Sequence, residues 1–177
     1  MTWPSAEPLT VGDLRLEPLR VDDAEEMAGV LADESLYRFI GGSAPTLSRL
    51  RARYRSQVHG ASSDGTQRWL NWIVRVAPDR AAAGFVQATL EDREPGHVLV
   101  ASLGWVVGPA WQGRGIATRA AGAVLGWLAS RGVAEFRAYI HPDNAASQRV
   151  AAKLGFRPTA LVLDGEFRWV SGPHTSG

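Results

Sequence analysis

The sequence predicts one domain of the α/β class, of the α+β type, in which helices flank a mostly antiparallel sheet. Strand-like segments joined by short turns are typical of an antiparallel meander, and three such segments lie at 69–76, 84–90 and 98–107. A helical segment and a short strand at 136–140 then follow, which is the order of a parallel crossover. No repeat, linker or low-complexity block divides residues 1–177, so a single domain is expected.

The N-terminal part begins with a segment that lacks a regular pattern. Residues 1–9 contain two prolines and small polar residues, so we expect a mobile tail there, and another at residues 171–177. The apolar alternation that starts at Leu14 predicts a first strand, which Pro18 ends.

Two helices are predicted before the meander. Asp22 is a suitable N-cap for a helix that runs to about Ala32, and Thr46 opens a second helix that ends near His59. The loop between them, residues 35–44, is rich in apolar side chains, so it should pack against the fold or line a cleft.

The C-terminal part predicts two more helices and a hairpin. Apolar residues recur at helical spacing from Ile116 until Gly132 ends the segment. Asn144 is the expected N-cap of the last helix, which Gly155 ends. Strands at 159–163 and 166–170 then flank Asp164-Gly165, a strong hairpin signal.

Composition excludes several classes of function. The 177 residues include no cysteine, which rules out disulfides and a thiolate nucleophile, and the four histidines are too scattered to predict a metal site. A net charge of +1 gives no broad case for nucleic-acid binding, and the arginines of Arg49–Arg55 spread around a helix as a solvated face does. Neither a membrane span nor a secretory signal is visible, so a cytoplasmic protein is expected.

The segment from Gly108 to Thr118 is the strongest local signal for ligand binding. It joins the strand at 98–107 to a helix through a turn that contains Gly113 and Gly115. Unpaired amides at a helix start attract anions, and glycine lets a ligand approach the backbone closely. A phosphate site and a simple tight turn both remain open from this pattern alone.

A second segment makes the pattern more specific. Gln112-Gly-Arg-Gly-Ile-Ala117 resembles the Gln/Arg-x-x-Gly-x-Gly/Ala motif of the GNAT superfamily of acyl-CoA N-acyltransferases. The segment from Asn144 to Phe156 resembles the Asn-x-x-Ser and Leu-Gly-Phe helix of the branch that includes ribosomal-protein-alanine N-acetyltransferases, and Leu14–Ala24 resembles the opening of that branch. These segments occur in family order over about residues 13–170.

The resemblance implies a GNAT-like fold, with a six- to seven-stranded sheet that is splayed in the middle and about four helices. It implies acetyl-CoA as cosubstrate, with the pyrophosphate on the turn formed by Gln112, Gly113, Arg114, Gly115, Ile116, Ala117 and Thr118. Trp105, Val106 and Val107 would line the pantetheine and thioester. Arg149 and Lys153 could reach a CoA phosphate, although ordinary solvated charges on a helix are the favoured explanation of both.

The resemblance also assigns catalytic roles. Ser147 would protonate the leaving thiolate, and Asn144 would bond the pantetheine or order the site. Ordinary helix-capping and backbone-bonding roles remain open for both, and Tyr139 is another candidate acid. Relatives often carry a carboxylate where this chain has Ser102. The base therefore stays open among Glu166, Asp164, Glu91, His141 and water.

Aromatic residues mark the expected acceptor site. Tyr37 and Phe39 from the loop, together with Trp72, would line it and suit a small-molecule amine or a protein N-terminus, although such residues are also common in cores. The sequence does not identify the acceptor, and a monomer and a homodimer are both compatible with it.

The sequence thus predicts an acetyl-CoA-dependent N-acetyltransferase. The alternative is a catalytically weak CoA-binding sensor or regulatory module, which the serine at position 102 favours. A dinucleotide site is disfavoured, because Thr118 stands where the last glycine of G-x-G-x-x-G is needed.

Overall fold

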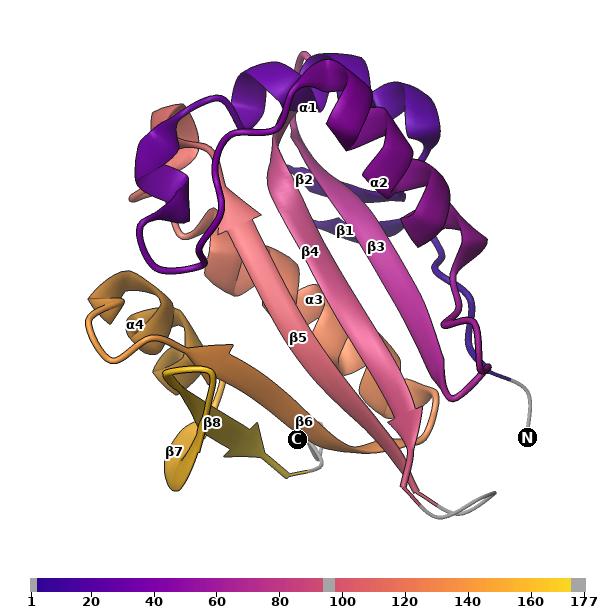
Figure 1. Cartoon of the computed structure of the whole chain (residues 1–177), viewed down its shortest axis with the longest axis vertical. Coiled ribbons are helices and arrows are strands. Elements are labelled where there is room, and N and C mark those ends of the chain that lie inside the picture. The colour runs from indigo at the N-terminus through magenta and orange to yellow at the C-terminus, as the bar shows by residue number, and fades with distance from the viewer. Residues whose placement is uncertain (1–2, 94–97, 173–177) are drawn as a thin grey trace.

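An open sheet with helices on both faces forms the framework of the molecule (Figure 1), in a computed structural model that describes residues 3–93 and 98–172. The strands lie in the order β1 (Leu9–Val11), β2 (Leu14–Pro18), β3 (Gln67–Val76), β4 (Ala81–Asp92), β5 (Leu99–Val107), β6 (Val133–Ile140), β8 (Glu166–Ser171) and β7 (Arg157–Leu163). Neighbouring strands are antiparallel except β5 and β6, which are parallel. The predicted fold class and parallel crossover are therefore confirmed.

The sheet in the described part of the chain has eight strands, one more than the upper number expected. The additional strand, β1, begins at Leu9, in the segment that we expected to be a mobile tail. That expectation is wrong for residues 3–9, because the Glu7 carbonyl accepts from the Trp72 indole at 2.8 Å and Leu9 packs on the core. At the other end, Ser171 still belongs to β8, and residues 173–177 lie outside the described part.

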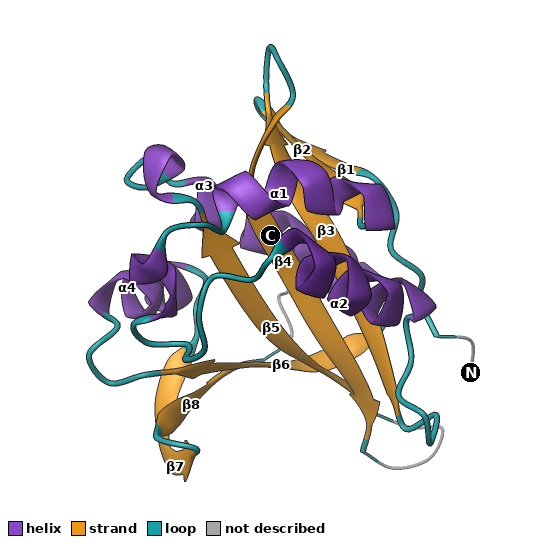
Figure 2. Cartoon of the chain, turned by 45° about the horizontal axis from the view of Figure 1, so that its top comes forward, coloured by secondary structure: helices purple, strands orange, loops and turns teal. Residues whose placement is uncertain are grey.

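Helices cover the two faces of the sheet unequally (Figures 1 and 2). Helices α1 (Ala24–Val30) and α2 (Leu47–His59) pack on one face, and α3 (Ile116–Ser130) packs on the other. Helix α4 (Ala145–Lys153) lies beside the end of β6 and against α3. Each face has its own apolar core, because the side chains of a strand alternate between the two faces.

The helix starts follow the predicted caps with one exception. Thr46 caps α2 by accepting from Arg49 N, and Asn144 caps α4 by accepting from Ser147 N at 3.1 Å, as expected. Asp22 is not the cap of α1. A short 3-10 turn, η1 (Val21–Asp23), precedes that helix, and the carboxylate of Asp23 accepts from Arg20 N at 2.7 Å instead.

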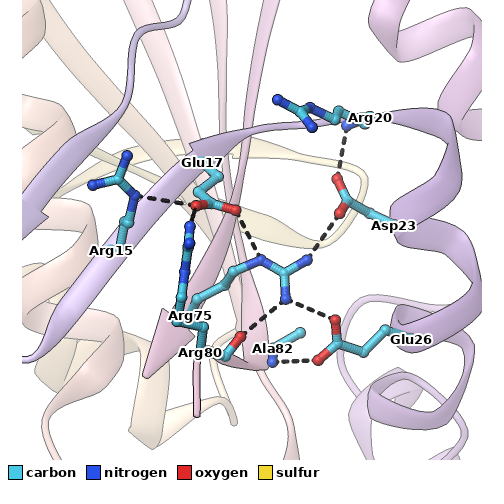
Figure 3. Close-up of polar contacts among 8 residues, drawn as sticks. All are labelled: Arg15, Glu17, Arg20, Asp23, Glu26, Arg75, Arg80 and Ala82. Carbon is cyan, nitrogen blue, oxygen red and sulfur yellow. Dashed lines mark hydrogen bonds and ion pairs between the residues drawn. The ribbon is translucent and has the colours of Figure 1, made fainter. Parts of the chain in front are cut away.

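One arginine joins α1 to the sheet (Figure 3). The Arg75 guanidinium on β3 contacts Glu17 on β2 at 3.0 Å, Asp23 before α1 at 2.9 Å and Glu26 on α1 at 2.7 Å. Glu26 also accepts from the backbone N–H of Ala82 on β4, at 2.7 Å. The Arg75 side chain is 14% exposed, so these charge-assisted bonds are partly shielded from water and hold α1 over three strands.

We expect Arg75→Met to lower the free energy of unfolding by about 2 kcal/mol, because it leaves the three carboxylates without their shared cation. Urea unfolding with an unchanged m-value measures this. Arg15→Met is the matched control, since Arg15 pairs with the same Glu17 but is 48% exposed, and it should cost less than about 1 kcal/mol. Equal effects of the two variants would contradict a special role for Arg75.

Candidate active site

The sheet opens where β5 and β6 stop pairing. The two strands are in register only from Leu99 opposite Val133 to Ser102 opposite Arg137. Beyond Ser102, β5 continues against β4 alone and β6 continues against β8 alone, so the strands diverge (Figures 1 and 2). One edge of β5, over residues 103–107, therefore lacks a neighbouring strand within the described structure.

Two glycines allow the close backbone contacts at the end of β5. A Cβ on Gly84 of β4 would overlap the carbonyl of Val106, so only glycine fits there. Ala83 is the extra residue of an irregularity in the β3–β4 pairing, and its carbonyl accepts from Gly108 N at 2.8 Å. A Cβ on Gly108 would lie 2.9 Å from Val30 of α1. The strand end is thus packed between β4 and α1.

The glycine-rich turn follows directly and presents the start of α3. Gly113 and Gly115 have φ values of 76° and 70°, a conformation that favours glycine, and Gly115 is the N-cap without any side-chain cap. Nothing lies within 4 Å of the position that a Cβ would occupy on either residue. No side chain therefore caps the first-turn amides of this 15-residue helix, an arrangement suited to an anion.

Side chains of the turn hold its shape. The Gln112 amide donates to the carbonyl of Val107 at 2.9 Å, which ties the turn to the end of β5. The Arg114 guanidinium lies 5.2 Å from the Trp111 ring centroid. Ile116 is buried beneath the helix start, whereas Ala117 and Thr118 are half-buried.

The residues expected to line the thioester lie on alternate faces of β5. Trp105 and Val107 pack on the core beneath α3, and Val106 packs on the core beneath α1 and α2. Ser102 and Gly104 share the face of Val106, because they are an even number of residues away. The face that carries α1 and α2 therefore holds the serine that stands in place of a carboxylate.

Helix α4 brings its polar start to the end of β6. The Asn144 side-chain oxygen caps the helix, and the Ser147 hydroxyl is half-buried. Neither that hydroxyl nor the amide nitrogen of Asn144 has a hydrogen-bond partner among residues 3–93 and 98–172, so both polar groups are available to a ligand. Arg149 and Lys153 are exposed one turn apart, without an ion pair to any described residue.

The loop after α1 reaches the same region. The Phe39 ring packs at 5.5 Å against the ring of His141, the residue after β6. The Tyr37 hydroxyl donates to the Leu31 carbonyl at 2.9 Å. The predicted apolar loop therefore contacts the turn between β6 and α4, on the far side of the divergence.

Trp72, the third residue expected at the acceptor site, has its side chain in the core beneath α3, although Trp72 is also among the residues that line a small cavity beside Tyr54 of α2. Its side chain is fully buried in the core beneath α3 and lies edge-on to Trp127 at 5.7 Å. Strand alternation places Trp72 on the α3 face of β3, whereas Ile73 packs beneath α1 and α2. The sequence shows the alternation but does not reveal which face of β3 carries the site.

Of the carboxylates named as possible bases, Glu166 has the most suitable environment. Burial raises its pKa above the usual 4.5, an effect that nearby His141 opposes and Asp164 reinforces. Glu91 lies near the other end of β4 and accepts from Gln67 at 2.7 Å. Gly84 was not among the residues expected at the site, although an isolated glycine in a strand pattern is itself a signal of close backbone approach.

No helix in the described part of the chain is both long and apolar enough to cross a membrane. A search of curated proteins found no match to this chain.

Solved acetyltransferases share the fold. The structure of RimL, a ribosomal L7/L12 alpha-N-protein acetyltransferase in complex with coenzyme A, superposes with a TM-score of 0.77 at 18% identity and covers 96% of this chain and 100% of that chain. Ribosomal-protein-S5-alanine acetyltransferase from Vibrio fischeri has a TM-score of 0.75 at 17% identity, and the match covers 96% of this chain and 98% of that chain. Spermidine N-acetyltransferase from Vibrio cholerae, in complex with CoA and spermine, has a TM-score of 0.71 at 16% identity, and the match covers 91% of this chain and 96% of that chain.

A sequence profile described as the acetyltransferase (GNAT) domain matches residues 13–157. That range contains the glycine-rich turn, the diverging strands and the start of α4. Because the match spans well over half of the chain, the protein belongs to the GNAT acetyltransferase family.

Proposed function

We propose that the protein transfers the acetyl group of acetyl-CoA to a primary amine, either a protein N-terminus or a small-molecule amine. The observation that carries this proposal is the free edge of β5 beyond Ser102, directly beside the uncapped start of α3. The amine nitrogen attacks the thioester carbon, the carbon–sulfur bond breaks, and the CoA thiol leaves with a proton. Direct attack mainly requires positioning, because a neutral amine reacts readily with a thioester.

The geometry of the turn and of the free strand edge supports the donor at this place. The amides of Gly113 to Ala117 would hold the pyrophosphate, and the pantetheine amides would pair with the free edge of β5 as an additional strand does. Trp105 and Val107 would contact the pantetheine from the α3 face. The exposure of Arg149 and Lys153 on α4 supports a contact with a CoA phosphate.

Three groups would serve the chemical step. A backbone N–H near Val106 or Val107 would donate to the developing oxyanion, because this edge of β5 has no strand partner. The Ser147 hydroxyl, which has no bond to its own helix, would protonate the thiolate. The Asn144 amide would donate to the pantetheine while its oxygen caps α4.

The amine proton needs another acceptor, since Ser102 cannot act as a carboxylate base. We infer that Glu166 takes this proton, directly or through water, because burial has moved its pKa towards neutrality. The ring of His141 beside it packs on Phe39, so the base and the acceptor loop would meet at the same place.

A CoA-binding module without turnover is the competing function, and Ser102 is the observation that favours it. Thiol release from acetyl-CoA with peptide and small amines, followed from about pH 6 to pH 9, separates the two. We expect turnover that decreases on the acid side as the acceptor amine gains its proton, and Glu166→Gln should lower kcat/KM at every pH tested because the base is lost. The absence of turnover with every amine would refute the enzyme proposal.

Ser147→Ala should lower kcat by about 100-fold, the lower range for the loss of a general acid, and should leave the KM for acetyl-CoA nearly unchanged. The fold should keep its stability, because the hydroxyl has no partner to lose among the residues that the structure describes. Ser56→Ala, on the exposed side of α2, is the control and should retain full kcat. An unchanged kcat in Ser147→Ala would remove this residue from the mechanism.

Gly115→Glu should abolish acetyl-CoA binding in calorimetry, because it places bulk and negative charge where the phosphates would lie. The φ of 70° adds a strain of about 1 kcal/mol, so the variant should still fold. Gly126→Glu introduces the same side chain at an exposed position of α3, also with nothing within 4 Å of the new Cβ. Acetyl-CoA affinity should survive there, and equal losses would refute the turn as the phosphate site.

A further inference from the structure

A small cavity lies on the face of the sheet that carries α1 and α2, close to the free edge of β5. Its volume is about 40 Å³, and its lining includes Tyr54 and Gln57 of α2, Asn71 of β3, and Phe85 and Gln87 of β4. Phe85 and Gln87 are paired with Val106 and Gly104 of β5, respectively. The cavity is therefore one strand away, about 4.8 Å, from the edge where the thioester would lie.

The cavity contains a buried polar group without a partner. Tyr54 is 4% exposed, and its hydroxyl has no hydrogen-bond partner in the described structure. Burial raises the pKa of Tyr54 to about 12, so the group stays a neutral hydroxyl that can donate. A buried hydroxyl without a partner is costly, and a ligand atom that accepts from it removes that cost.

A cation lies beside this hydroxyl. Arg53 also lines the cavity, and its charge acts on Tyr54 against that of Asp23 and on Tyr37 against that of Glu34. Arg53 is exposed and makes no ion pair with any residue that the structure describes, whereas Arg51 on another side of the helix pairs with Glu25 at 2.5 Å. The sequence predicted that the arginines of Arg49–Arg55 form a solvated helix face. One of them, Arg53, instead borders the cavity.

A larger hollow borders this cavity and has no described lining residue from β5. It has a volume of about 760 Å³ and shares Leu19, Gln57 and Asn71 with the small cavity. Its charged lining residue is Arg68, whose guanidinium lies 5.4 Å from the Trp3 ring centroid. Among the described lining residues of both hollows there is no aspartate or glutamate.

We propose that the acceptor is a peptide or protein N-terminus that carries a carboxylate within its first few residues, bound in these two hollows with the carboxylate at Arg53 and Tyr54. This proposal rests on the proposed acetyl transfer and specifies its acceptor. Hydrogen bonds from a cation and a hydroxyl select an anion, and a lining without carboxylates disfavours polycationic amines. The volume of about 760 Å³ in the larger hollow favours a chain over a single amino acid.

The test uses two heptapeptides that differ only in Asp or Asn at positions 2 and 3, together with free glutamate and spermidine. Binding to the full-length protein saturated with CoA is measured by calorimetry, so it does not depend on turnover. We expect the Asp peptide to bind about tenfold more tightly than the Asn peptide, and more tightly than glutamate or spermidine. Equal binding of the two peptides, or a preference for glutamate or spermidine, would overturn the proposal.

Variants then locate the selectivity. Arg53→Gln should reduce the Asp-to-Asn ratio to near one, and Tyr54→Phe should reduce it partly without loss of stability, since it removes an unpaired hydroxyl. Arg55→Gln makes the same charge change on another exposed position of α2 and should preserve the ratio. If Arg53→Gln and Arg55→Gln lowered the Asp-to-Asn ratio equally, the selectivity would come from general electrostatic attraction, and the proposed subsite would be refuted. Retained selectivity without thiol release from acetyl-CoA would refute only the proposed reaction.

Discussion

The candidate active site depends on the point at which β5 and β6 stop sharing hydrogen bonds. Up to Ser102 the parallel pair holds the two halves of the sheet together, and beyond it each strand keeps only its outer neighbour. A sheet edge without a partner normally invites pairing with another chain. Here the same edge ends in the turn before α3, so backbone donors and acceptors of β5 lie next to the free amides of a helix start.

The divergence is supported on both sides. Glycine at position 84 lets β4 approach the carbonyl of Val106, and Gly108 packs under Val30 of α1. Helix α1 is in turn held to β2, β3 and β4 by the Arg75 network (Figure 3). The loop that follows α1 then contacts His141 at the end of β6. Interactions remote from the proposed chemistry thus position the loop on the face that we assign to the acceptor.

Much of the donor side was predictable, because its signals are local. Positive φ at Gly113 and Gly115, and the cap at Asn144, follow from residue types whose backbone preferences need no distant partner. The acceptor side was less predictable. Alternation in β3 shows that Trp72 and Ile73 point in opposite directions, but only packing decides which of them meets α3.

The sequence by itself determined the fold class, the order of the elements and the phosphate-type turn, since periodicity, caps and glycine positions are encoded within a few residues. Tertiary structure decided that residues 3–9 join the core, that Asp23 rather than Asp22 bonds at the start of α1, and that Arg53 and Tyr54 border one cavity. These outcomes depend on contacts between segments far apart in the chain. A distant partner such as the Glu7 carbonyl, or a buried unpaired hydroxyl such as that of Tyr54, exists only once the sheet and helices are assembled.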